Sequence, residues 1–268
     1  TFDWIKGVAA GMIAYRAIMT AFNAITGSIT GTIGAAIEFE DSLANLNKVV
    51  SVTPDKLMQM GEQFRELSKL IPLPLKDIIE IGTKAAQLGV AEEDVADFTK
   101  VIANLAATAD NLTVDFASMS LAKFANVMRV NQKDFDNLGS TILYLGNTSK
   151  ATEKDIINMS TRIAAAGTQM GMSAADVISM ATALTSVGVR AEMGGTAMSR
   201  VMYKIDKDIA TNSKRLQTYA KLTNRTVEEF KQAFRKDAAM AVAEFVQGLG
   251  SLDKSSGQAT LALRELGI

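Results

Sequence analysis

Proline is nearly absent from this chain, and its absence narrows the possible folds more than any other feature. The 268 residues contain three prolines, at positions 54, 72 and 74. Because proline breaks the interior of a helix, the rest of the sequence is free to form long helices. Apolar residues make up 48% of the chain and aromatic residues only 6%, with Ala, Leu, Met and Ile dominant. This composition favours helix over sheet and predicts an all-α fold.

Histidine and cysteine are both absent. Disulfides, Cys/His zinc sites and a Ser-His-Asp triad are therefore impossible. The formal net charge of −1 provides no global attraction to nucleic acid or anionic lipid. No Walker, Rossmann or EF-hand motif is present. We predict a protein that is not an enzyme, holds no cofactor or metal, and does not bind a specific nucleic-acid sequence.

The first 37 residues form an apolar, Gly/Thr-rich segment. Residues 17–37 carry no charge, and this run is about long enough for a helix to span a bilayer. Gly27 and Gly31 have the spacing that lets two helices approach closely, and Gly34 continues the small-residue face. We interpret the segment as a helix that packs on copies of itself or inside a tube. A membrane-active helix and a disordered segment are the alternatives.

From Glu38 onward the sequence changes to amphipathic helices of ordinary length. Pro54 marks a helix start, Pro72 and Pro74 mark its end, and another helix is predicted from about Leu75 to Leu88. Four pairs have the spacing of a capping box, with a small polar residue three positions before an acid. They are Asn131/Asp134, Thr152/Asp155, Ser173/Asp176 and Thr226/Glu229.

Two acidic clusters, residues 38–41 and 92–94, are the candidates for a paired-carboxylate hydrolase site. We interpret both as helix starts, where acids interact favourably with the helix dipole. A short motif also recurs, beginning at Gly89, Arg129 and Gly171, about 40 residues apart. This recurrence suits stacked helical hairpins, although repeated use of one turn explains it nearly as well.

Several motifs between residues 38 and 209 occur in a familiar order. They are Ala36–Leu43, Ala85–Val90, Leu105–Ala109 and Met193–Met198. This stretch resembles the core domain of phage tail tape measure proteins. The sequence departs from the family pattern at Gly194, where the family usually has Ala; both residues are small.

The resemblance implies a structural protein that occupies the tail lumen or tip, templates tube assembly and length, and is released during genome ejection. The implied partners are parallel copies of the chain, tail tube and tail tip or baseplate proteins, and the host membrane during ejection. The implied location is the virion, after assembly in the host cytoplasm. We expect a fragment of a longer protein with an apolar helical segment (1–37), a tape measure core (38–210) and a C-terminal helical extension (211–268).

Two further sets of residues are candidate sites. Gly188, Gly194 and Gly195 are predicted to lie in an interhelical turn, and a hinge or close helix crossing at Gly194 and Gly195 is the alternative. Residues 200–236 are locally basic, as on a solvated helix face or a face that docks on an acidic tube wall. The candidate docking residues are Arg200, Lys204, Lys207, Lys214 and Arg215.

Two other function classes compete with the tail protein. A pore-forming or toxin-like helical protein would explain the uncharged run but not the ordered motifs of the core. A hydrolase that relies on carboxylates alone would need an acid pair outside a helix cap, and we find none.

Overall fold

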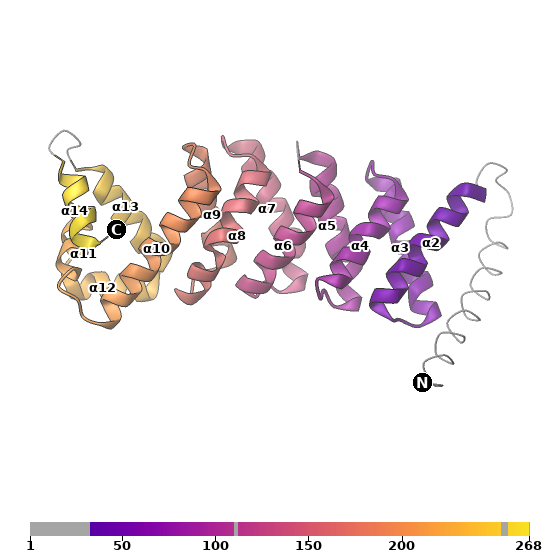
Figure 1. The fold of residues 1–268 in the computed structure, drawn as a ribbon, viewed down its shortest axis with the longest axis horizontal. Helices are drawn as coiled ribbons and strands as arrows, with labels where there is room; N and C mark the ends of the chain where they lie inside the picture. Colours follow the sequence, from indigo (N-terminus) through magenta and orange to yellow (C-terminus); the bar gives the residue numbers. More distant parts are fainter. Residues whose placement is uncertain (1–32, 110–111, 253–256, 268) are drawn as a thin grey trace. The chain divides into compact units, whose positions relative to one another are not determined.

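The computed structural model describes residues 33–109, 112–252 and 257–267, and this part of the chain is all-α (Figure 1). It contains 13 α-helices and two 3-10 helices, and none of these residues forms a strand. The predicted fold class is thus confirmed for the described residues. The chain divides into two compact units, residues 1–108 with 113–119, and residues 109–112 with 120–268. The division falls inside the predicted 38–210 segment, so the three-part organisation stays a prediction.

The first unit is a group of short antiparallel helices around α4. In this unit α4 packs against α2, α3 and α5. Pro54 is the first residue of α3 and follows the N-cap Thr53, as predicted. The helices of this unit are α2 (Ile33–Val50), α3 (Pro54–Leu70), α4 (Leu75–Gln87), η1 (Glu92–Asp94) and α5 (Val95–Thr108).

The core of the first unit consists of fully buried aromatic and aliphatic side chains. Phe64 from α3 contacts the backbone of α4 at Gly82, where an added Cβ would lie 2.6 Å from Phe64 Cζ. The absence of a side chain at Gly82 therefore makes room for the ring. Other side chains with no exposed surface are Ile78, Ile79, Phe98 and Ile102.

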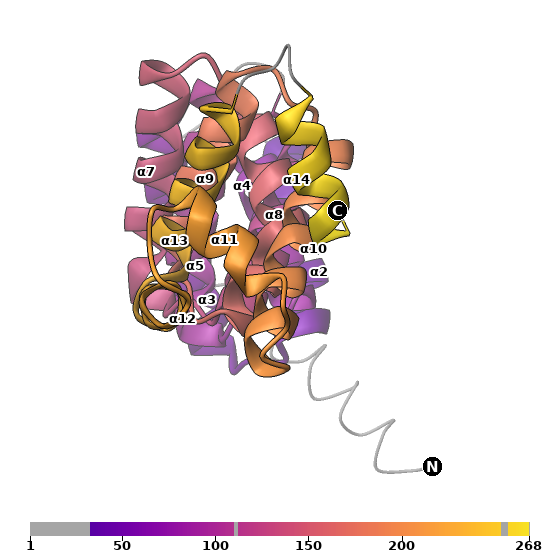
Figure 2. The same ribbon diagram turned by 90° about the vertical axis from the view of Figure 1, so that its left-hand side faces the viewer.

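The second unit arranges its helices in two layers. Figure 2 shows α7, α9 and α13 on one side of this unit and α8 and α10 on the other. Helix α8 packs closely against α10 within the second layer and against α9 of the first layer. The helices are α6 (Val114–Met128, which begins in the first unit), η2 (Gln132–Asp134), α7 (Phe135–Thr148), α8 (Glu153–Gln169), α9 (Ala174–Ser186), α10 (Ala191–Ala210), α11 (Leu216–Leu222), α12 (Val227–Lys236), α13 (Ala238–Gly250) and α14 (Gln258–Leu266).

One turn geometry recurs at the ends of α4, α6, α8 and α10. The first or second residue after each helix has positive φ. These residues are Gly89, Arg129, Gly171 and Asn212, which are 40, 42 and 41 residues apart. In each turn the next N–H donates to the carbonyl five residues earlier, as in a Schellman motif. The motif predicted from sequence at the first three positions thus has the same backbone geometry, and Asn212 is a fourth copy at about the same spacing. Gly188 after α9 and Asn224 after α11 also have this geometry, with bonds from the Val189 N–H to the Leu184 carbonyl and from the Arg225 N–H to the Ala220 carbonyl.

The fourth turn, at Asn212, differs in the residue whose main-chain carbonyl accepts this bond. In the first three turns that residue is Ala85, Ala125 or Gly167, whereas in the fourth it is Asp208. The Asp208 side chain is fully buried and accepts hydrogen bonds from Arg215 Nε (3.0 Å) and Nη2 (2.7 Å) and from Tyr219 Oη (3.1 Å). A carboxylate that needs hydrogen-bond partners therefore replaces a small side chain. The N-cap residue of α11, Arg215, and Tyr219 within α11 are these partners.

Burial raises the pKa of the Tyr219 phenol, and the adjacent Asp208 carboxylate raises it further. The hydroxyl therefore stays protonated and available as a donor to Asp208. The Tyr219 ring stacks on Phe230 with centroids 5.5 Å apart and meets Phe245 edge-on at 5.4 Å. Asp208 thus connects α10 to the aromatic core formed by α11, α12 and α13.

Three of the four predicted capping pairs form side-chain caps on α-helices. Ser173/Asp176 and Thr226/Glu229 are reciprocal capping boxes, and Thr152 accepts from the Asp155 N–H. The fourth prediction was wrong as an α-helix cap, because Asn131 Oδ1 accepts from the Lys133 N–H beside the short helix η2.

The interpretation of the acidic clusters was correct for one and wrong for the other. Residues 92–94 form η1 directly before α5. Residues 38–41 instead lie within α2, which already includes Ile33. Their carboxylates are therefore on the body of a helix, with Phe39 providing the buried side chain in this turn.

Candidate functional site

The predicted basic residues divide into one group on α10 and two residues that lie elsewhere. Arg200, Lys204 and Lys207 follow one another at spacings of four and three residues, which places them on one side of the helix. They line a shallow depression of about 500 Å³ together with Tyr203, Ala197 and Gly267. We call the three cations the basic face of α10.

Within the described residues the basic face gathers positive charge, although the charge of Lys204 also interacts with the Asp208 carboxylate. Among the described residues, no carboxylate forms an ion pair with Arg200, Lys204 or Lys207. The intervening acid, Asp206, accepts a hydrogen bond from the Gln169 amide of α8 at 3.1 Å. Unpaired cations grouped beside an exposed aromatic side chain, here Tyr203, suit contact with an acidic surface. The sequence analysis did not include Tyr203 among the docking residues, although its spacing from Arg200 and Lys207 places it on the same side of α10.

The other two predicted docking residues do not belong to the basic face. Arg215 forms an ion pair with the buried Asp208, and its side chain is about one-third exposed. Lys214 is exposed but lies in the segment before α11. Arg215 therefore has a structural role in the fold, because a buried carboxylate requires a cation, and the five-residue docking face stays a prediction.

The three predicted turn glycines have two different roles. Gly188 lies between α9 and α10 with a φ of +83°, as a turn requires. Gly194 and Gly195 instead lie inside α10 and are buried, so the turn prediction was wrong for both. A Cβ at Gly194 would lie 2.8 Å from Met159 Cε, and one at Gly195 would lie 2.6 Å from Arg162 Cβ. They provide the close crossing of α10 over α8, which was the alternative interpretation.

The candidate membrane or helix-packing segment falls almost wholly outside the described residues. Gly27 and Gly31 lie outside them, and Gly34 is in the first turn of α2. Among the helices that are described, none combines the length and apolar character that crossing a bilayer requires. The predicted role of these glycines stays a prediction.

The charged groups of the described residues are arranged for structure rather than for acid–base chemistry. Burial raises the pKa of Asp208, but hydrogen bonds from Arg215 and Tyr219 and the charges of Arg215 and Lys204 lower it more. Backbone hydrogen bonds lower the pKa of Glu192 and of the capping residue Glu229. A general acid needs a raised pKa, and every resolved carboxyl shift is downward. Within the same residues, no three Asp or Glu side chains are grouped to hold a metal ion.

Comparison with family models identifies the chain. Residues 61–264, which include helices of both units, match the model for phage-related minor tail proteins. The chain belongs to the phage-related minor tail protein family. It is therefore a component of the virion tail, and membership in a structural tail family favours a role without catalysis. No curated protein matches the chain.

The family match extends past the predicted end of the tape measure core at residue 210. It includes α11, α12 and α13 and ends in α14. The minor tail protein thus includes the helices that pack around Tyr219 as well as the helices of the predicted core.

Proposed function

We propose that this minor tail protein is a folded module of a tail tape measure protein. In this role it occupies the tail lumen or tip, takes part in templating the tube and setting its length, and is released during genome ejection. The observation that carries the proposal is the family match over residues 61–264. The ordered motifs between residues 38 and 209, which resemble the tape measure core domain, support it.

The helix lengths suit a compact module better than the shaft of a ruler. An α-helix rises about 1.5 Å per residue, so a ruler gains length from long continuous helices. The longest described helix, α10, has 20 residues and spans only about 30 Å. Helices α8 and α9 are shorter and fold back on each other. We therefore assign the described residues to an end of the tail, where the chain contacts the tip or the first part of the tube.

The tape measure role is tested by changing the length of the protein in the virus that encodes it. We expect an in-frame insertion of about 42 helical residues in the same gene, outside residues 33–267, to lengthen tails by roughly 60 Å. Tail lengths would be measured by negative-stain electron microscopy beside a matched deletion, which should shorten them. Tails of unchanged length in both viruses would refute the ruler role and leave a minor structural role.

The proposed docking partners are tail tube or tip proteins with an acidic surface, contacted by the basic face of α10. Reversal of charge in R200E/K204E/K207E should reduce the yield of tailed particles, because like charges at a contact repel. The matched control is K123E/K133E/K150E, which reverses three exposed lysines elsewhere in the second unit. Equal particle yields for the two variants would refute docking through this face.

We also propose that copies of the chain associate in parallel through residues 1–37. Light scattering on the chain with and without this segment provides the test. An oligomer that falls to a monomer on truncation supports the assignment, and a monomer in both forms refutes it. Assembly would take place in the host cytoplasm before the virion is complete.

A membrane-active role during ejection is the second candidate, and it rests on the uncharged run of residues 17–37. A peptide of residues 1–50 should then bind liposomes and release an enclosed dye. A peptide that shows neither binding nor leakage would remove the membrane from the mechanism.

A further inference from the structure

Helix α13 is apolar on more than one side, which is unusual for a helix with exposed faces. It buries Ala238, Ala241, Val242 and Phe245, yet Met240 is 57% exposed and Val246 is 43% exposed. Its one charged side chain, Glu244, is occupied by Arg225 through two hydrogen bonds of 2.8 and 3.1 Å. An exposed apolar face of this kind marks a surface that binds a partner.

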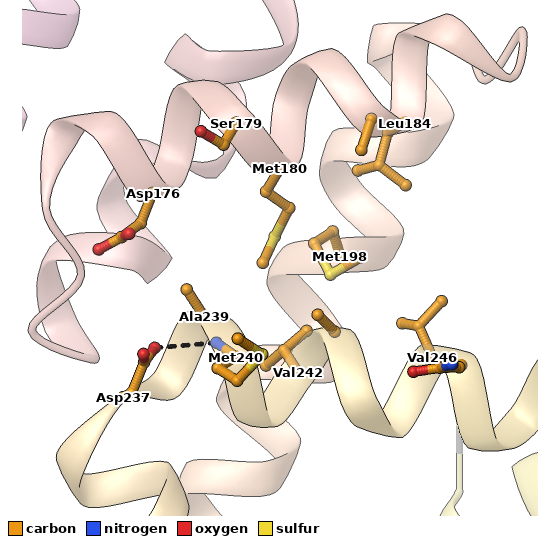
Figure 3. A pocket seen from close by; sticks show the side chains of 13 residues that line it. Asp176, Ser179, Met180, Leu184, Met198, Asp237, Ala239, Met240, Val242 and Val246 are labelled. Atoms are coloured by element: carbon orange, nitrogen blue, oxygen red, sulfur yellow. Dashed lines mark hydrogen bonds between the residues drawn. The ribbon is translucent and has the colours of Figure 1, made fainter.

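The exposed face of α13 forms one wall of an apolar groove, and α9 forms the other (Figure 3). The groove has a volume of about 520 Å³. On α9 the wall consists of Met180, Ala183 and Leu184, and on α13 it consists of Met240, Ala243 and Val246. Met198 of α10 is nearly buried and also lines the groove. All of these residues belong to the second unit.

The shape and composition of the groove fit one more α-helix. Each wall is one face of a helix with lining residues three or four apart over about two turns, a periodicity that matches another helix laid alongside. Three methionines line the groove, and their flexible, polarisable side chains adapt to a partner surface. Small residues, Ala183 and Ala243, leave room for side chains of the incoming helix.

Charge defines the direction in which such a helix would lie. Asp176 and Asp237 lie together at one end of the groove, with Leu184 and Val246 at the other (Figure 3). Both acids are at helix N-termini, because Asp176 caps α9 within its capping box and Asp237 is the N-cap of α13. Apart from these two carboxylates, the groove lining carries no charged side chain.

We propose that this groove binds an amphipathic helix of a partner protein that lies antiparallel to α9 and α13. The partner presents apolar side chains at positions i, i+3 or i+4, and i+7, and a Lys or Arg in its last turn. Its cation then meets Asp176 and Asp237, whose two negative charges exceed the positive ends of the α9 and α13 dipoles that they cap. The same cation also stabilises the C-terminal end of its own helix, so the two preferences coincide.

The test uses a fluorescein-labelled helical peptide with Leu at the four groove-facing positions, Gln and Glu elsewhere, and two Lys in the last turn. Its binding to the full chain would be followed by fluorescence anisotropy. We expect A243E and M240E each to weaken binding at least tenfold, because a charge would be buried in the apolar groove. M193E is the control, since Met193 is an exposed α10 methionine outside the groove lining and should leave binding unchanged.

A separate variant tests the predicted interaction between the partner's cation and the carboxylates of Asp176 and Asp237. D176N/D237N removes both charges but keeps an amide oxygen at each position. Asn is a good N-cap residue in place of Asp237, and at position 176 the amide oxygen can still accept from the Ser173 N–H, so α9 and α13 should stay folded. We expect it to bind the Lys peptide several-fold more weakly than the unchanged chain does. A matched peptide with Gln in place of both Lys should bind both proteins equally.

Three results would overturn the proposal. The first is no binding of the peptide at concentrations of about 1 mM. The second is equal binding by the unchanged chain, A243E and M240E, with circular dichroism showing that the variants are folded. The third is a dimer of the chain that M240E converts to monomer in light scattering, since a second copy would then cover the groove.

Discussion

Replacement of Asp208 by alanine should destabilise the second unit more than removal of any other charged side chain of α10. The carboxylate has no exposed surface and holds Arg215 through two bonds of 2.7 and 3.0 Å and Tyr219 through one of 3.1 Å. The variant leaves the buried Tyr219 hydroxyl without an acceptor and frees the Arg215 guanidinium.

The size of the loss follows from these contacts. Breaking a buried ion pair by removing one partner costs about 3–5 kcal/mol. The Arg215 side chain is 37% exposed, so the freed guanidinium regains contact with water and the cost is at the lower end. The orphaned Tyr219 hydroxyl adds about 1–3 kcal/mol. We expect D208A to lower the free energy of unfolding by about 4 kcal/mol, and Y219F to lower it by about 1 kcal/mol.

Urea unfolding followed by far-UV circular dichroism measures this change, and amide hydrogen exchange in α10, α11 and α13 locates it. D206A is the matched control, because Asp206 is on the same helix and accepts one bond, from Gln169, at a partly exposed site. The control should lose less than about 1 kcal/mol. Equal losses for D208A and D206A would refute the reasoning.

The same site predicts a dependence on pH. Burial raises the pKa of Asp208, but Arg215, Tyr219 and Lys204 lower it more, so it lies below its ordinary value. The contribution of the carboxylate is then complete above the unfolded pKa of about 4 and is lost as pH falls through the lower folded value. The stability difference between the unchanged chain and D208A should therefore be constant from about pH 7 to 5 and shrink below about pH 4. A difference that grows on acidification would contradict this sign.

Three further substitutions, one with a matched control, test a packing contact, a turn and a helix cap by urea unfolding. G248A should cost about 2–3 kcal/mol, because its Cβ would lie 2.0 Å from the Leu222 carbonyl oxygen. The control G250A has no atom within 4 Å of the added Cβ and should change stability by less than about 1 kcal/mol. Equal effects of the two substitutions would refute the contact. R129G should stabilise the chain by about 0.5 kcal/mol, since Arg129 has a φ of +53° that costs an L-residue about 1 kcal/mol, and any loss of stability would argue against strain there. T226A removes the hydroxyl that accepts from the Glu229 N–H and keeps the backbone bond from residue 226 to Glu229 Oε2. It should cost about 1 kcal/mol, while an unchanged midpoint would show that α12 does not depend on this side-chain cap.

The sequence by itself was sufficient for features that depend on a few neighbouring residues. The scarcity of proline and the Ala/Leu/Met composition predicted helices, and Pro54 predicted the start of α3. The motif repeated at Gly89, Arg129 and Gly171 predicted turns with a common geometry. Caps and positive-φ turns are local, because their hydrogen bonds join residues within about five positions of one another. The order of these local motifs also carried the resemblance to a tail protein family.

Only the tertiary structure decided which helix faces meet. Gly194 and Gly195 resemble a turn in sequence, but both lie inside α10. A Cβ at Gly194 would meet Val189 and Met159, and one at Gly195 would meet Arg162 of α8, so close packing explains why both residues are glycine. Arg215 resembles a surface cation in sequence, but its guanidinium donates hydrogen bonds to the buried Asp208. The groove between α9 and α13 brings together residues about 60 positions apart, so no local sequence pattern predicts it. Burial is a property of a contact between distant segments, and a linear sequence specifies the apolar residues without specifying their partners.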